Sequence, residues 1–268
     1  MKPELKFLPV FLFLFTGVVL NAQEITPASC YGGKRLMKEF IKEEMVYPAF
    51  ELNNHIEGTV VLSFLVEPDG KVSDLNVHTS VSPALDEEAI RIMKHILWYP
   101  ARELGKPIPY INHFEVKFDV RKYEKLCRNR GYDKITYAHT PIDTSWNIYP
   151  QIDVEISPKP VYNSSNYNFS SFVSNNLEYP EAAFKQNISG TVKLKFVVEP
   201  SGRISNILIE DAVGGGCTEE AIRVVKLIKW TPGILNGFAV RTWMCLEITF
   251  DIASRTVAGK IPTPGQVH

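Results

Sequence analysis

Apolar and polar side chains alternate with a period of two from Gly58 onward, which predicts a β-strand with one buried face. Its inward side chains are expected to be Val60, Leu62, Phe64 and Val66. The sequence Glu-Pro-Asp-Gly at 67–70 predicts a tight turn, because proline presets its own backbone angle and glycine accepts a left-handed one. A second strand then returns and completes a hairpin. It is expected to run through Val72, Leu75 and Val77.

A period of about 3.6 residues replaces this alternation on both sides of the hairpin and predicts helices. Before the hairpin, residues 34–45 carry an apolar stripe, and a short helix is expected over 48–54. After it, Ser82 predicts the cap of a third helix that ends near Trp98. A last strand is expected over 108–120. The predicted order is therefore helix, helix, strand, strand, helix, strand.

This whole pattern is present twice. Residues 47–119 align without a gap with residues 179–251 when the sequence is shifted by about 132 positions, and roughly one position in three is identical. An ungapped match of this length indicates one small fold in two copies. In the second copy the outward positions of the first strand include Lys193 and Lys195, which predicts an antiparallel sheet with one face in water and helices on the other.

The repeat divides the chain into five parts. We predict an export signal over 1–22, a first repeat over 30–120, a partly ordered spacer over 121–166, a second repeat over 167–252 and a frayed tail over 253–268. Within the spacer, the alternation over 152–156 predicts a short strand, and the basic run that starts at Arg121 is interpreted as a solvated linker.

The N-terminus has the layout of an export signal, with Lys2 and Lys6 before an apolar run over 7–20. We predict cleavage after Ala22 and a soluble protein in the periplasm. Because Leu20 is larger than the usual residue three positions before a cleavage site, an uncleaved inner-membrane anchor is the alternative.

The charges and cysteines exclude some functions. The 29 Lys and Arg residues balance the 30 Asp and Glu residues, so a nucleic-acid partner is not expected. Cys217 and Cys245 are expected to face different sides of the sheet and to be free thiols. Cys30 and Cys127 flank the first repeat, and a disulfide between them would join its two ends.

Candidate catalytic residues do not recur between the copies. The histidines of the first copy are replaced in the second: His55, His78, His95 and His113 fall on Asn187, Glu210, Leu227 and Cys245. The recurring carboxylates, Glu87/Glu219 and Glu88/Glu220, are explained by the positive end of a helix, and Trp98/Trp230 by the core. We therefore predict no catalytic site, no metal site and no cofactor.

The ordered motifs resemble the C-terminal domain of the TonB energy-transducing proteins. They are Tyr-Pro, the Gly-x-Val strand, the turn with Pro-Asp/Ser-Gly, Glu-Glu-Ala-Ile-Arg on a helix and Trp-x-Pro after it. The resemblance covers both repeats and implies a fold of the α+β class. Two tandem small domains are expected, each a three-stranded antiparallel sheet with helices packed on one face.

In that family the domain binds an extended segment of outer-membrane transporters, which implies strand addition to the edge of the last strand. The matching residues of this chain are His113, Phe114, Glu115, Val116, Lys117 and Phe118 in the first repeat, and Cys245, Leu246, Glu247, Ile248, Thr249 and Phe250 in the second. The motif Tyr47-Pro48, with Tyr179-Pro180, is a further candidate for binding.

The chain departs from the family in two respects that concern energy transduction. No proline-rich segment precedes Cys30, and Glu44-Met45 stands where the family often has Gln-Pro. The leading hypothesis is a non-enzymatic periplasmic module that binds a transporter or another envelope protein. The alternative is a structural or scaffolding protein that uses its domains for self-association, as in a homodimer, or for cell-wall contact.

Overall fold

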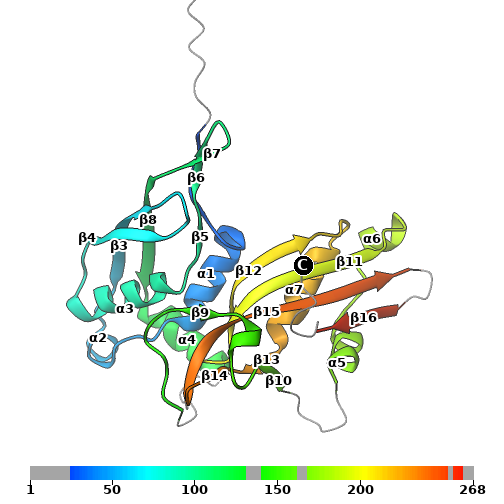
Figure 1. The fold of residues 1–268 in the computed structure, drawn as a ribbon. Coiled ribbons are helices and arrows are strands. Elements are labelled where there is room, and N and C mark those ends of the chain that lie inside the picture. Colours follow the sequence, from blue (N-terminus) through cyan, green and yellow to red (C-terminus); the bar gives the residue numbers. More distant parts are fainter. Residues whose placement is uncertain (1–24, 131–139, 162–167, 253–255, 262–268) are drawn as a thin grey trace, which may run out of the picture.

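The computed structural model describes residues 25–130, 140–161, 168–252 and 256–261. It contains the two predicted repeats, which lie next to each other, the first on the left of Figure 1 and the second on the right. The predicted export signal lies outside the described residues, as do parts of the spacer and of the tail.

The first repeat has the predicted order of its main elements. These are α1 (Gly33–Glu44), α2 (Ala49–Asn53), β3 (Gly58–Val66), β4 (Val72–Thr79), α3 (Pro83–Lys94) and β8 (Tyr110–Phe118). The strands form a three-stranded antiparallel sheet in the order β4-β3-β8. Fold class and architecture of this copy are thus confirmed.

The inward positions of the first repeat form its core. Val60, Leu62, Phe64 and Val66 are buried against α3, as the alternation predicted. Ser82 caps α3, since its Oγ accepts a hydrogen bond from the backbone N–H of Leu85 at 3.3 Å. On β4, Val72 and Leu75 pack against this core, whereas the side chain of Val77 is 37% exposed.

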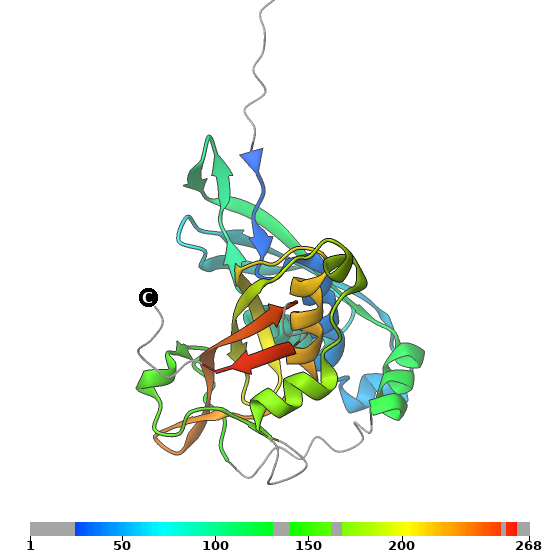
Figure 2. The ribbon, with the colours of Figure 1, turned by 90° about the vertical axis from the view of Figure 1, so that its right-hand side faces the viewer.

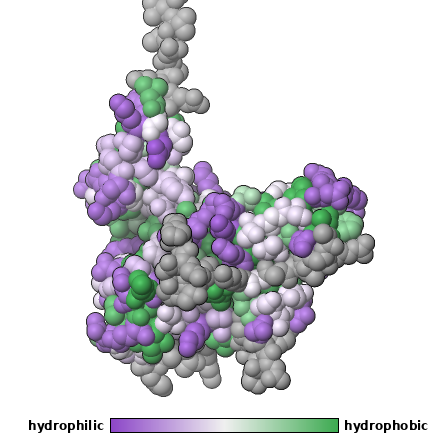
Figure 3. Space-filling model, turned by 45° about the vertical axis from the view of Figure 1, so that its right-hand side comes forward, coloured by the Kyte–Doolittle hydropathy of each residue, from purple (hydrophilic) through white to green (hydrophobic). Residues whose placement is uncertain are grey.

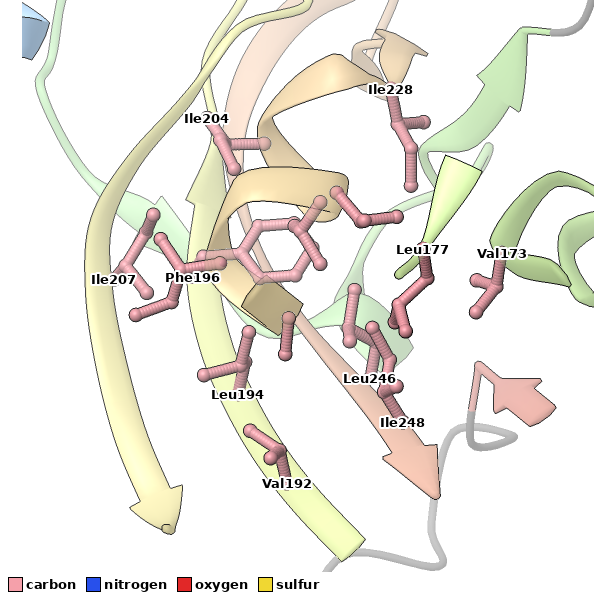
Figure 4. Packing of buried hydrophobic residues seen from close by; sticks show 14 of the residues in the cluster. Val173, Leu177, Val192, Leu194, Phe196, Ile204, Ile207, Ile228, Leu246 and Ile248 are labelled. Atoms are coloured by element: carbon pink, nitrogen blue, oxygen red, sulfur yellow. The ribbon is translucent and has the colours of Figure 1, made fainter. Parts of the chain in front are cut away.

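The second repeat repeats this order with a larger sheet. Its main elements are α5 (Phe169–Asn176), α6 (Glu181–Lys185), β11 (Gly190–Val198), β12 (Ile204–Asp211), α7 (Cys217–Leu227) and β15 (Phe238–Asp251). Three strands were expected, but the sheet has six: β12, β11, β15 and β14 (Gly233–Leu235) in that order, with β9 (Ile148–Tyr149) and β16 (Thr256–Lys260) also paired to β15. Figure 4 shows apolar side chains of β11, β12 and β15 packed together with α5 and α7 over one face of this sheet.

Short strands that no sequence pattern predicted complete each copy. They are β1 (Ile25–Thr26), β2 (Ser29–Cys30), β5 (Trp98–Tyr99), β6 (Ala101–Glu103) and β7 (Lys106–Ile108) in the first copy, and β10 (Lys159–Val161) and β13 (Lys229–Thr231) in the second. The pairing of β2 with β5 is matched by that of β10 with β13. Runs of two or three residues are too short to show a period.

The last strand differs between the copies at one position. In the first copy Pro109 separates β7 from β8, whereas in the second copy Arg241 occupies the matching position inside the continuous strand β15. Proline lacks the N–H that a strand ladder needs, so the first copy breaks there and its β6–β7 hairpin becomes a separate arm. Figure 1 shows this arm projecting from the top of the first repeat.

The spacer and the tail differ from their predictions. The basic run after the first repeat is a helix, α4 (Val120–Arg130), whose Tyr123 packs against the first core. Residues 152–156 do not form a strand, because Gln151–Asp153 is a single 3₁₀ turn and only Ile156 makes an isolated bridge, to Ile234. The tail was expected to be frayed, but it contributes β16 to the second sheet.

All four cysteines are free thiols, so the disulfide suggested between Cys30 and Cys127 is wrong. Cys217 is buried in the second core and Cys245 is half-buried, in agreement with the prediction of free thiols. No helix among the described residues is long and apolar enough to cross a membrane.

Candidate binding edges and the junction between the repeats

The last strand of the first repeat has one open edge. β8 pairs antiparallel with β3, from Gly58 opposite Phe118 to Val66 opposite Tyr110. Among the described residues no strand pairs with the other edge of β8. Its side chains alternate as predicted: Phe114, Val116 and Phe118 are buried, and His113, Glu115 and Lys117 are exposed.

The matching edge of the second repeat is covered by the chain itself. β16 pairs antiparallel with β15, from Glu247 opposite Lys260 to Asp251 opposite Thr256. Nearer the start of β15, β9 pairs with Arg241 and Thr242 in parallel. Of the predicted binding residues in this copy, 247–250 therefore already have a strand partner within the chain.

A glycine lets β16 lie close to α5, as Figure 2 shows for the red strand beside the yellow-green helix. A Cβ at Gly259 would lie 2.6 Å from Phe169 Cε1 and 2.6 Å from Val173 Cγ2, which is too close for any side chain. The next described residue after β16, Ile261, packs against the second core. This strand therefore fits its site through packing as well as through backbone hydrogen bonds.

The structure places the Tyr-Pro motif at the start of a short helix in both copies. Pro48 caps α2, and the hydroxyl of Tyr47 donates a hydrogen bond to the carbonyl of Ile56 at 2.6 Å. Burial, with nearby carboxylates, raises the pKa of Tyr47 to about 12. In the second copy Pro180 caps α6 and the Tyr179 hydroxyl donates to the carbonyl of Ile188 at 2.5 Å. The motif thus closes a local turn, and its part in binding stays a prediction.

The recurring glutamate of the third helix does more than balance the helix dipole. Glu88 is buried, and its Oε1 accepts a hydrogen bond from the backbone N–H of Val46 at 2.7 Å. In the second copy Glu220 Oε1 accepts from the N–H of Glu178 at 2.8 Å. The arginine three residues later, Arg91 or Arg223, pairs with this carboxylate in each copy. The signal was available in the sequence as a recurring Glu-x-x-Arg spacing.

The two repeats meet at a buried carboxylate that the sequence assigned only to a turn. Glu199 of the second repeat is 0% exposed. It accepts hydrogen bonds from Arg241 Nε and Nη2, both at 2.9 Å, from His95 Nδ1 at 3.0 Å and from the Ser205 hydroxyl. Because His95 follows α3 of the first repeat, this carboxylate joins both repeats.

Further contacts make the two repeats one packed body. The side chain of Asn206 donates to the carbonyl of His95 at 2.7 Å and accepts from the N–H of Leu97 at 2.8 Å. Arg203 forms an ion pair with Glu44 of the first repeat at 3.1 Å. Leu36, on α1 of the first repeat, belongs to the core of the second. The two copies are therefore packed against each other rather than held apart by the spacer.

The groups around Glu199 keep its carboxyl deprotonated by lowering its pKa. Burial alone would raise the pKa of this carboxyl, but the charge of Arg241 and the hydrogen bonds from His95 and Arg241 lower it to about 2. An ordinary glutamate titrates near pH 4.3 in an unfolded chain. The charged form of Glu199 therefore stabilises the folded protein above that pH.

We expect this contribution to be lost as the pH falls from about 4.3 towards about 2, because the folded protein must then bind a proton that it holds weakly. The measurement is urea unfolding of the native chain and of the Glu199→Gln variant over this pH range. The difference in unfolding free energy between the two should shrink as the pH falls. A difference that stays constant would contradict this role.

A cavity of about 480 Å³ lies beside this junction, bordered by both repeats and by the spacer residues Ile142 and Trp146. The arginines in its wall are already paired: Arg91 binds Glu44 and Glu88, and Arg241 binds Glu199. No group of three or more possible metal ligands occurs among the residues that the structure describes.

Two small α+β domains, each with helices packed on one face of an antiparallel sheet, define the class of this protein. The family described as the Gram-negative bacterial TonB protein C-terminal matches residues 43–120 and 175–252, together more than half of the chain. The chain therefore belongs to this family. Its members are envelope-associated, non-enzymatic interaction modules that bind proteins such as outer-membrane receptors and take part in TonB-dependent transport.

The chain is also similar in sequence to a solved structure of this family. It is the NMR solution structure of the TonB C-terminal domain of Helicobacter pylori (residues 179–285), at 22% identity, with a TM-score of 0.23. The match covers 32% of this chain and 78% of that one. No curated protein matches the chain.

Proposed function

We propose that this chain binds an extended segment of an outer-membrane transporter, or of another envelope protein, by strand addition to β8 in the periplasm. The observation that carries the proposal is the open edge: β8 pairs only with β3 among the described residues, whereas β16 covers the same edge of the second repeat. The proposal therefore assigns the recipient edge to β8 of the first repeat.

Strand addition explains both affinity and selectivity at β8. The unpaired N–H and C=O groups of the edge would form backbone hydrogen bonds with an incoming segment of almost any sequence. Selectivity would come from the side chains on the exposed face, where His113, Glu115 and Lys117 alternate with the buried residues. Charges of both signs on this face favour a segment with polar residues at alternate positions.

The second repeat acts in this proposal as a support for the first. On its own edge, Glu247–Phe250 of the predicted binding residues pair with β16 and become available only when β16 leaves. The junction around Glu199 fixes the first repeat against it. The proposal therefore has one binding site held against the second repeat, without the gain in affinity that two linked sites would give.

NMR titration of the chain from Gln23 onward with a synthetic transporter segment tests the proposal. Signals of residues 113–118 should shift, and those of residues 245–250 should not. The intact chain is needed because the repeats share a core residue, Leu36. Absence of shifts along β8 would contradict strand addition. Concentration-dependent shifts along β8 without any peptide would instead support self-association, which is the scaffolding alternative.

A further inference from the structure

Two exposed histidines lie together on the outer face of the first sheet, which is the face opposite its core. His78 belongs to β4 and His113 to β8, the strands on either side of β3. Their rings meet edge to face, with the centroids 5.7 Å apart. Neither ring hydrogen-bonds to another residue that the structure describes. The fold therefore brings two imidazoles with unused nitrogens close to each other.

A β-bulge gives His78 its place in this pair. Between β3 and β4, Val61 lies opposite Thr79 and Leu62 lies opposite Val77. His78 is thus an extra residue between two pairs of the ladder. A bulge interrupts the alternation of a strand and changes the direction of a side chain. The irregular step in β4 therefore brings a histidine towards the one on β8.

The separation of the two rings suits one metal ion between them. The bond from zinc to an imidazole nitrogen is about 2 Å long, which places the centre of the ring about 3 Å from the metal. Two imidazoles on one ion therefore have their centres up to about 6 Å apart. The observed 5.7 Å lies within this limit. Imidazole is also a preferred ligand of zinc, copper and nickel.

The second copy carries another pair of possible metal ligands at the same two positions. Glu210 stands where the first copy has His78, and Cys245 stands where it has His113. Glu210 is likewise the extra residue of a bulge, in β12. Burial and the charge of Glu210 raise the pKa of the Cys245 thiol, so these two side chains are also neighbours. The fold thus pairs these positions in both copies.

The central strand differs between the copies at the residue beside each pair. In the second copy Lys195 of β11 lies opposite Cys245, and its positive charge acts against the rise in the pKa of the thiol. In the first copy Ser63 of β3 has the matching place, opposite His113. The second copy therefore supplies its own cation at this place. The first copy has a small uncharged side chain there and two ligands that can hold a cation from solution.

The surroundings of the pair leave an ion in contact with water. Hydrophilic side chains predominate at the upper left of Figure 3, where the first repeat lies. Glu115 is exposed two residues after His113, on the same face of β8, and adds a negative charge nearby. Among the described residues no third histidine, cysteine or carboxylate completes a cluster with the pair. A bound ion would therefore keep positions for water, and it would bind less tightly than in a closed site with four protein ligands.

We propose that His78 and His113 bind one divalent transition-metal ion, of the class of Zn²⁺ or Cu²⁺, on the outer face of the first sheet. The ion would connect β4 to β8 across β3. Because the unfolded chain has no preformed site, binding would stabilise the first repeat. The site uses side chains on the face of the sheet, whereas strand addition uses the backbone at its edge. The two proposals can therefore fail separately.

Isothermal titration calorimetry with Zn²⁺ tests the site on the chain from Gln23 onward, produced without a histidine tag. One ion should bind per chain, whereas Mg²⁺, which prefers oxygen ligands, should not bind at this site. His78→Gln and His113→Gln should each weaken zinc binding by more than about tenfold, a loss typical even of residues that only support a metal ligand. Zinc binding that is unchanged in both variants would overturn the proposal.

A third exposed histidine of the first copy provides the matched control. His55 has a φ of 52°, and Asn187 has the same φ at the matching position of the second copy. His55→Asn should therefore keep the local backbone and leave the affinity for zinc unchanged. If this variant loses as much affinity as His78→Gln and His113→Gln, the ion binds to surface histidines in general and the proposed site does not exist.

A change in the central strand tests the geometry without removing either ligand. Ser63→Lys gives the first copy the lysine that the second copy has as Lys195, so the fold should accept it. Its ammonium should repel the ion and abolish zinc binding, whereas Ser63→Thr should retain it. In NMR spectra of the native chain, Zn²⁺ should shift the signals of residues 61–63, 76–79 and 113. Equal zinc binding by the two variants, or shifts confined to other residues, would contradict the proposed site.

Discussion

Replacing Arg241 with methionine is expected to lower the free energy of unfolding by about 3–5 kcal/mol, because it leaves a buried carboxylate without its main charge partner. Arg241 makes two hydrogen bonds to Glu199 and a third to the carbonyl of His95 at 2.8 Å. Both charged groups are buried, so water cannot replace the lost contacts. Urea unfolding at neutral pH measures the loss.

A surface ion pair provides the control for this experiment. Lys185 pairs with Glu181 at 2.6 Å, but both side chains are largely exposed. Lys185→Met should therefore change the unfolding free energy by about 1 kcal/mol or less. A loss at Arg241 as small as that at Lys185 would mean that the junction contributes little to stability.

A double variant separates the cost of an unpaired charge from the value of the pair. Arg241→Met together with Glu199→Leu removes both charges, and it should be more stable than Arg241→Met alone. His95 and Ser205 would still lose their acceptor, so we do not expect full recovery. A double variant less stable than the single one would show that packing, rather than charge, governs the junction.

The fold of each copy was predictable because its main elements are long enough to show a period. The alternation of Val60, Leu62, Phe64 and Val66 places four side chains in one core, and Ser82 marks the start of α3. The strands of two or three residues were not predictable, since pairs such as β2 and β5 are formed by tertiary contact. β16 was also missed, although it pairs with β15, the strand directly before it in the chain.

The sequence predicted where the two candidate edges lie, but not which of them is covered by another strand of the chain. The alternation and the family resemblance located His113–Phe118 and Cys245–Phe250 equally well. What distinguishes them is the segment that follows each repeat, a helix after the first and a strand after the second. The junction around Glu199 was not predicted, because the search for functional residues favoured those that recur in both copies. His95 and Arg241 have no counterpart of the same type, and for that reason they can join two copies of one fold.

Removal of residues 253–268 is expected to open the second edge and to raise the number of bound peptides from about one to about two per chain. The truncation takes away β16, which pairs with Glu247–Asp251, and Ile261, which packs against the core. The edge left behind has the same position in its repeat as β8 has in the first. Isothermal titration calorimetry with the transporter segment measures the stoichiometry.

Two further variants show whether β16 itself closes the edge. Removal of 262–268 alone leaves β16 and Ile261 in place and should bind one peptide, as the native chain does. Gly259→Val keeps the full length but brings its Cβ within 2.6 Å of Phe169 and Val173, so β16 should detach and the result should resemble the longer truncation. An open edge can also pair with another chain, so self-association of the 253–268 truncation and of Gly259→Val in sedimentation would equally show that β16 had covered it. If the 253–268 truncation and Gly259→Val both stay monomeric and bind a single peptide, strand addition at the second edge does not occur, and β16 serves the stability of the second repeat alone.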